Sequence, residues 1–182
     1  CLGILGLAAG GPVEASHDQT LEVGVVERRF AVAERRVEHP ALAELLHPHH
    51  RLLLVAAVHV GWRGLVAGVV ENTLAALGSG RELVAWMGPA ISRRGFEVGP
   101  EVVEVLAGDD EEARSCFLPG AGDRSMADLF GLLRLRLDRA GVVDVAGGEY
   151  CTFSDPERFY SHRRDGLSGR MATLVWRAAE KD

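Results

Sequence analysis

Residues 55–65 read Val55-Ala56-Ala57-Val58-His59-Val60-Gly61-Trp62-Arg63-Gly64-Leu65. Small and β-branched apolar residues lead up to His59, and runs of this kind are typical of a buried strand. The polar groups that follow therefore lie where the strand ends. A neutral imidazole at such a place is suited to bind a metal or carry a proton, and an arginine such as Arg63 can hold a phosphate or carboxylate with two parallel hydrogen bonds. We therefore expect a functional site at this strand end.

Two further blocks lie downstream. Residues 151–170 concentrate Cys, Ser, His, Arg and Asp side chains between two strand-like stretches. Taken alone, this block is more simply interpreted as a salt-bridged surface turn. The other block reads Met87-Gly88-Pro89-Ala90-Ile91-Ser92-Arg93-Arg94-Gly95-Phe96-Glu97-Val98-Gly99-Pro100.

The composition narrows the class of protein. The chain has 182 residues, of which 47% are apolar, and this suits a single domain with a sizeable core. A net charge of −6 argues against a general nucleic-acid binder, which is usually basic. Apolar runs stay below the ~20 residues that span a bilayer, so no membrane partner is expected. Three cysteines without a CxxC pair do not suggest a disulfide framework and favour the reducing cytoplasm.

Periodicity predicts strands alternating with helices, hence an α/β layered domain. Apolar residues at helical spacing predict a helix over 65–77. A proline suited to the first helical position predicts a helix over 100–106, and a third is predicted over 126–140, with Ser125 as its cap. Strands are predicted over residues 21–26, 52–59, 83–87, 142–145, 149–153 and 172–176.

The three blocks, in this order and at these separations, resemble the YfiH family. This family is also called the multicopper polyphenol oxidase or laccase-domain family, and more recently a family of purine nucleoside enzymes. The family pattern has His-Ala-Gly-Trp-Arg-Gly, then Ile-Gly-Pro leading to Tyr-Glu-Val-Gly, and then Cys-Thr, Phe-Ser-Tyr-Arg-Arg-Asp-Gly and Thr-Gly-Arg. The matching segments here are His59–Gly64, Met87–Pro89, Phe96–Gly99, Cys151–Thr152, Tyr160–Gly166 and Ser168–Arg170. The resemblance covers roughly residues 52–177.

The resemblance implies a fold of the α/β (α+β) class, a layered sandwich of mixed β-sheets flanked by helices. It implies one domain over residues 1–182, truncated at its N-terminus, in which residues 1–51 match the family poorly. The implied activity is phosphorolysis of adenosine, inosine, guanosine or methylthioadenosine, with some adenosine deamination. The implied partners are a purine nucleoside and phosphate.

The family binds a metal, usually taken as zinc, through two histidines and one cysteine. Such a set leaves an open position for water or substrate. His59 matches one histidine. The other two family ligands are not in place, and His17 and His39 are the nearest candidates. Residues 1–51 could come from a shifted reading frame, the protein could be a degenerate member, or the three histidines could form an unusual site, in decreasing order of preference.

The remaining candidate residues follow from the same blocks. His59 and Arg63 are the candidate catalytic residues. Arg163, Arg164, Cys151 and Thr152 are candidate substrate-binding residues, and one of the two arginines is expected to be functional. His162 stands where the family has tyrosine, and we interpret it as a surface histidine.

Two rival functions stay open. A copper-dependent polyphenol oxidase is less favoured, because such copper sites need many His and Cys ligands and no matched segment holds a His-x-His pair. A non-catalytic family member is favoured by the missing ligands. The intact Arg63 and Arg163-Arg164-Asp165 positions count against it.

Overall fold

The computed structural model describes residues 3–12, 21–25, 50–77 and 82–177 of the chain. Its largest sheet has four strands in the order β3-β1-β4-β8, namely β3 (His50–Val60), β1 (Gly3–Pro12), β4 (Glu82–Met87) and β8 (Asp144–Gly147). Strand β1 runs antiparallel to β3 and β4, whereas β8 is parallel to β4. The sheet is therefore mixed.

Two smaller antiparallel sheets accompany it. One pairs β2 (Leu21–Val25) with β9 (Thr173–Arg177). The other has the order β5-β7-β6 and consists of β5 (Glu97–Val98), β6 (Phe117–Pro119) and β7 (Ser125–Ala127).

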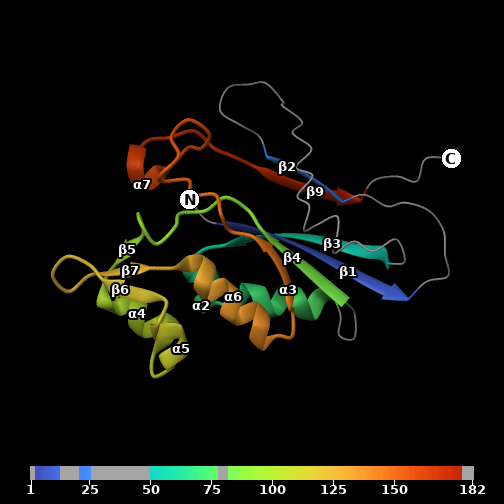
Figure 1. Ribbon diagram of the computed structural model, residues 1–182, viewed down its shortest axis with the longest axis horizontal. Coiled ribbons are helices and arrows are strands. Elements are labelled where there is room, and N and C mark those ends of the chain that lie inside the picture. The colour runs from blue at the N-terminus through green and yellow to red at the C-terminus, as the bar shows by residue number, and fades with distance from the viewer. Residues whose placement is uncertain (1–2, 13–20, 26–49, 78–81, 178–182) are drawn as a thin grey trace.

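Helices cover one face of the four-stranded sheet. In Figure 1, α2, α3 and α6 lie below this sheet, whereas β2 and β9 lie above it. The small β5-β7-β6 sheet lies at one end with α4 and α5, and α7 lies above that end. The helices are α2 (Trp62–Val66), α3 (Val69–Leu77), α4 (Pro100–Ala107), α5 (Glu111–Arg114), α6 (Leu129–Arg139) and α7 (His162–Asp165).

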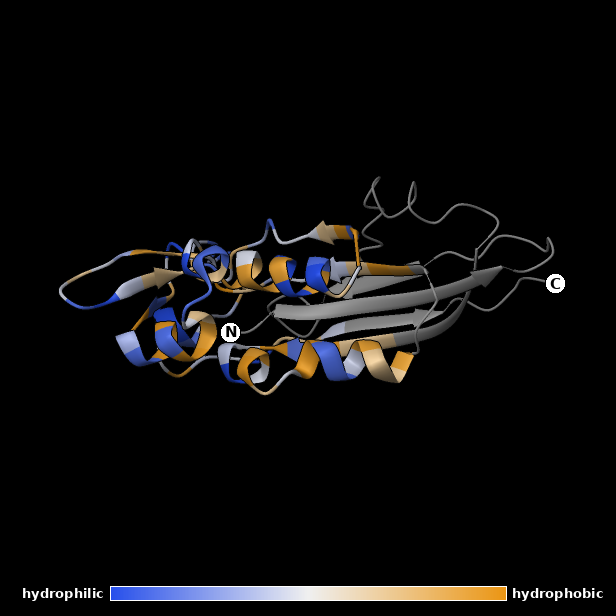
Figure 2. Cartoon of the chain, turned by 90° about the horizontal axis from the view of Figure 1, so that it is seen from below, coloured by the Kyte–Doolittle hydropathy of each residue, from blue (hydrophilic) through white to orange (hydrophobic). Residues whose placement is uncertain are grey.

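The core forms between helices and sheet because the helices are amphipathic. Hydrophobic and hydrophilic residues alternate along them in Figure 2. Helix α3 buries Val70, Leu74 and Leu77, and α6 buries six apolar residues, among them Leu137 at 0% exposure. Strand β4 contributes the buried Ala85, Trp86 and Met87. Burial of these apolar surfaces is the main force that holds the layers together.

The mixed-sheet fold class predicted from the sequence is confirmed, and so are strands β2, β3, β4 and β9 and helix α4 to within a few residues. The single helix predicted over 65–77 is wrong. The structure has two helices, because Gly68 adopts a φ of 71°, a conformation that ends a helix and that glycine tolerates best.

The predicted helix over 126–140, capped by Ser125, begins too early. Residues 125–127 form β7, and the cap is Asp128, whose carboxylate accepts a hydrogen bond from the Gly131 N–H at 3.0 Å. The predicted strand over 149–153 is also wrong. Cys151 forms an isolated bridge with Ala90, and the chain then turns.

Strand β1 was missed by the sequence patterns because glycine and alanine, which dominate it, have low strand propensity. The predicted ligands His17 and His39 lie outside the described residues. Within the described part of the chain, no helix combines the length and apolar character needed to cross a membrane.

Candidate active site

The three sequence blocks meet at one pocket. Its volume is about 440 Å³, and it is lined by His59, Gly61, Trp62, Arg63, Gly64, Ile91, Phe96, His162 and Arg163. The first five belong to the end of β3 and to α2, the next two to the segment between β4 and β5, and the last two to α7. Segments about a hundred residues apart in the chain therefore share one cavity.

The end of β3 supplies an imidazole and a guanidinium. His59 is the penultimate residue of the strand, and its side chain is open to solvent. Partial burial lowers the pKa of His59, which favours the neutral form that binds metals or accepts a proton. Helix α2 begins directly after Gly61, and the guanidinium carbon of Arg63 lies 4.3 Å from the centre of the Trp62 ring.

Helix α7 supplies the other two basic residues of the pocket, His162 and Arg163. Ser161 caps it, and its hydroxyl accepts a hydrogen bond from the Arg164 N–H at 3.4 Å. Arg163 then lies with its guanidinium carbon 5.4 Å from the centre of the buried Phe96 ring. Its Nη1 donates to the Glu97 carbonyl oxygen at 3.0 Å. Arg163 is thus anchored at one nitrogen while its side chain remains exposed.

Arg164 has a different role from its neighbour. Its Nη1 donates to the carbonyls of Thr152 at 2.7 Å and Phe153 at 3.0 Å, and its Nη2 donates to the Phe159 carbonyl at 2.9 Å. It also pairs with the Asp165 carboxylate at 2.7 Å. Arg164 therefore clamps the loop from residue 152 to residue 159 and does not line the pocket.

The pair Cys151 and Thr152 joins the C-terminal loop to the segment after β4. Thr152 is fully buried, and its N–H donates to the Ala90 carbonyl at 2.8 Å. The Ser92 hydroxyl donates to the Cys151 sulfur at 3.0 Å. Burial raises the pKa of Cys151, but hydrogen bonds from Ser154 and Ser92 outweigh it and lower the value to about 7. This is the environment of a reactive thiol.

Close packing keeps this loop against the segment before β5. A Cβ at Gly95 would lie 2.4 Å from the Phe153 ring, so no larger residue fits there without movement. The parallel bridge between Ala90 and Cys151 ties the same two segments together through their backbones. These contacts hold the loop after Cys151 against the segment between β4 and β5.

The structure brings together some of the predicted residues. His59, Arg63 and Arg163 line the pocket, whereas Arg164, Cys151 and Thr152 do not. His162 is exposed, as predicted, but it lies at the pocket and not on an unrelated surface. The apolar lining residues Trp62, Ile91 and Phe96 had no predicted role, although all three lie within the blocks that carry the family resemblance.

The described residues do not make up the expected zinc site. His59 is in place, but no group of three or more His, Cys, Asp or Glu side chains that could hold a metal occurs in residues 3–12, 21–25, 50–77 and 82–177. His162 adds a second imidazole to the pocket. These residues alone do not fit a three-ligand zinc ion.

Comparison with known proteins agrees with the sequence blocks. The sequence pattern of the family described as multi-copper polyphenol oxidoreductase laccase matches residues 44–178. A Pseudomonas aeruginosa protein named purine nucleoside phosphorylase is 55% identical over 124 residues, which cover 67% of this chain and 51% of the relative. The Escherichia coli purine nucleoside phosphorylase YfiH is 46% identical over 123 residues, covering 67% of this chain and 50% of the relative.

Solved structures show the same fold. A Neisseria meningitidis protein described by the family name DUF152 superposes with a TM-score of 0.63 at 45% identity, covering 67% of this chain and 51% of that one. The Bacillus licheniformis hypothetical protein YfiH superposes with a TM-score of 0.61 at 26% identity, covering 66% and 49%. The chain spans about half the length of the curated relatives that it matches.

Proposed function

The chain belongs to the multi-copper polyphenol oxidoreductase laccase family, and from this premise we propose that it catalyses the phosphorolysis of purine nucleosides. Its relatives in Pseudomonas aeruginosa and Escherichia coli are named for this reaction. The observation that carries the proposal is the pocket itself, whose lining combines basic side chains with the apolar side chains of Trp62, Ile91 and Phe96. Apolar and aromatic walls suit a flat purine, and basic groups suit phosphate.

The residues of the pocket suggest how the reaction proceeds. A phosphate oxygen forms a bond to C1′ of the sugar while the bond from C1′ to the purine nitrogen breaks. The purine keeps the electron pair of the broken bond and takes up a proton, and the proposed carrier of this proton is His59, which lines the pocket. The basic residues stabilise the negative charge of the phosphate as it attacks. A sugar 1-phosphate and the free base are the products.

The finer parts of the proposal concern substrate, metal and location. Adenosine, inosine, guanosine and methylthioadenosine are the proposed substrates, with adenosine deamination as a side reaction in the cytoplasm. Zinc is the proposed cofactor: His59 would be one of its ligands, and the metal would supply the Lewis acidity that a deamination needs. His17 and His39 stay predictions, because they lie outside the described residues.

One observation favours a second candidate, a non-catalytic family member. Among the described residues, no three side chains form a metal site. A binding protein that retained the pocket without its full ligand set would show the same arrangement. It would bind nucleoside or phosphate without converting them.

Chromatography of the products separates these candidates. Adenosine and inosine are incubated with zinc-loaded protein, with and without phosphate. Release of adenine and hypoxanthine only when phosphate is present is the expected result, and inosine formed from adenosine without phosphate would report deamination. Folded protein that forms neither free base nor inosine would refute the enzyme and leave the non-catalytic member.

A further inference from the structure

The pocket is strongly basic on an acidic protein. The chain has a net charge of −6, yet the lining contains His59, Arg63, His162 and Arg163 and no carboxylate. The remaining lining residues are glycines and apolar side chains. The two guanidinium charges, with no carboxylate among the lining residues, raise the local concentration of anions in the cavity.

Two aromatic rings support the two arginines. The guanidinium of Arg63 lies over Trp62 at 4.3 Å and that of Arg163 over Phe96 at 5.4 Å. Phe96 is only 5% exposed, so its ring is held by the core. Stacking on a ring holds a guanidinium by its face and leaves the N–H groups at its edge available to an acceptor.

The pocket arginines differ in their partners from four other arginines of the described chain. Arg93, Arg136, Arg139 and Arg164 each pair with a carboxylate within 3.0 Å. No ion pair joins Arg63 or Arg163 to a carboxylate of the described residues, and the single hydrogen bond of the Arg163 side chain there goes to a backbone carbonyl. The charge of both arginines is therefore not neutralised by these residues.

We propose that Arg63 and Arg163 together form a subsite for a phosphate dianion. Within the reaction proposed above, on which this inference rests, the subsite takes inorganic phosphate as substrate and the phosphate group of the pentose 1-phosphate as product. Two guanidinium edges from α2 and α7 provide several N–H donors, and charge-assisted hydrogen bonds of this kind are short and strong. The Ile91 side chain and the parts of the aromatic rings that the guanidinium groups do not cover are left for the nucleoside.

Calorimetric titration with inorganic phosphate tests the subsite without relying on catalysis. Arg63→Gln and Arg163→Gln are each expected to weaken phosphate binding by roughly tenfold to a hundredfold, because each removes charge-assisted hydrogen bonds. Arg124→Gln is the matched control, since it removes one exposed positive charge from the turn between β6 and β7. It is expected to leave binding unchanged. Ribose 1-phosphate is titrated in parallel, and it should lose affinity in the same two variants.

Arg63→Gln should disturb the fold less than Arg163→Gln. The Arg63 side chain is exposed, whereas Arg163 also donates a hydrogen bond to the Glu97 carbonyl. Circular dichroism checks that each variant is folded. Unchanged phosphate affinity in folded Arg63→Gln, an equal loss in Arg124→Gln, or no phosphate binding by the unaltered chain would each overturn the subsite.

The outcomes also separate this inference from the proposed function. Phosphate binding that depends on both arginines, with no base released from any nucleoside, would support the subsite and refute the phosphorylase. Phosphate-dependent base release whose KM for phosphate is the same in both Gln variants would support the phosphorylase and refute the subsite.

Discussion

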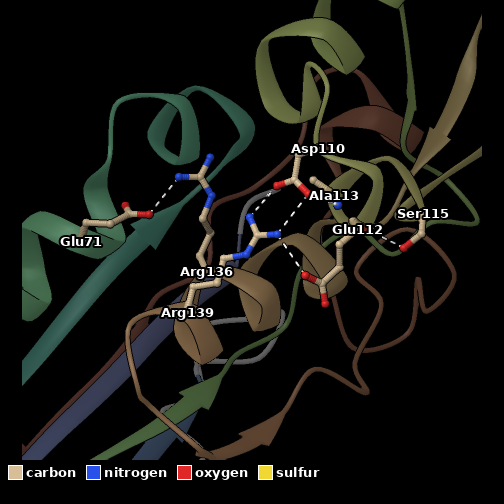
Figure 3. Close-up of polar contacts among 7 residues, drawn as sticks. All are labelled: Glu71, Asp110, Glu112, Ala113, Ser115, Arg136 and Arg139. Atoms are coloured by element: carbon tan, nitrogen blue, oxygen red, sulfur yellow. Dashed lines mark hydrogen bonds and ion pairs between the residues drawn. The ribbon is translucent and has the colours of Figure 1, made fainter.

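The two arginines of the pocket and the pair Arg136 and Arg139 of α6 use the same side chain in opposite ways. Figure 3 shows Arg139 of α6 reaching Asp110 and Glu112, while Arg136 reaches Glu71 of α3. Arg139 makes two hydrogen bonds to the Asp110 carboxylate, at 2.5 and 3.0 Å, and one to Glu112 at 3.0 Å. Hydrogen bonds from this guanidinium and from the Ala113 N–H lower the pKa of Asp110 to about 2. In the pocket, by contrast, Arg63 and Arg163 stack on rings and meet no carboxylate of the described residues.

The difference shows where the fold uses charge and where it leaves charge for a ligand. A paired guanidinium has its field compensated by its partner and joins elements, as Arg136 joins α6 to α3. An arginine that rests on an aromatic face is positioned without being neutralised. The neighbours Arg163 and Arg164 show both uses in consecutive residues.

The largest expected effect separates these neighbours. Arg164→Ala would leave three loop carbonyls without their donor, and we expect it to lower the free energy of unfolding by about 3 kcal/mol. Arg163→Ala loses one bond to a carbonyl and should cost less than about 1 kcal/mol. Urea denaturation of both variants measures the difference. Equal losses of unfolding free energy in the two variants would contradict the distinction between Arg164, which holds the loop, and Arg163, which lines the pocket.

The next effect concerns activity at the pocket. His59→Ala should reduce phosphate-dependent base release by about a hundredfold or more, because it removes the group proposed to move the proton. Its stability should change little, since the side chain is open to solvent. His50→Ala, at the other end of β3, is the matched control. If the His50 variant lost as much activity, the effect could not be assigned to the pocket. Metal analysis of both variants by mass spectrometry would show whether bound zinc depends on His59.

A smaller effect is expected for the reactivity of the two cysteines Cys151 and Cys116. The alkylation rate of Cys151 by iodoacetamide should rise about tenfold between pH 6 and pH 8, because its pKa is about 7 and the thiolate is the reactive form. Burial raises the pKa of Cys116, so its peptide should react slowly over this range. Peptide mass spectrometry resolves the two. Ser92→Ala should move the Cys151 midpoint to higher pH, since it removes a donor that stabilises the thiolate. An unmoved midpoint would contradict this cause.

The smallest effect concerns the paired arginines. Arg136→Gln breaks the 2.9 Å ion pair with Glu71, in which both side chains are partly exposed, and should cost about 1 kcal/mol or less. The loss should shrink in high salt, which screens such pairs. Urea denaturation at low and high salt measures it, with Arg124→Gln as a reference. A loss that does not depend on salt would point to packing and not to charge.

Much of the fold followed from the sequence because its patterns are local. The apolar run before His59 predicted β3, and the proline at the start of α4 predicted that helix. The sequence patterns gave wrong predictions where one backbone conformation, or pairing with a distant segment, determines the secondary structure. Gly68 breaks a continuous helical pattern, and residues 125–127 become a strand because they pair with β5 and β6.

The candidate site, like the fold, could be predicted only in part from the sequence. By itself, the sequence determined which functional groups the site can contain, because His59, Arg63 and the pair Arg163 and Arg164 stand in recognisable blocks. Only the tertiary structure decided which of them share a pocket. Arg163 and Arg164 are adjacent in the chain, but the turn of α7 directs one to Phe96 and the other to the loop carbonyls. Residue type fixes what a side chain can bind, whereas its direction and partners depend on contacts between segments far apart in the chain.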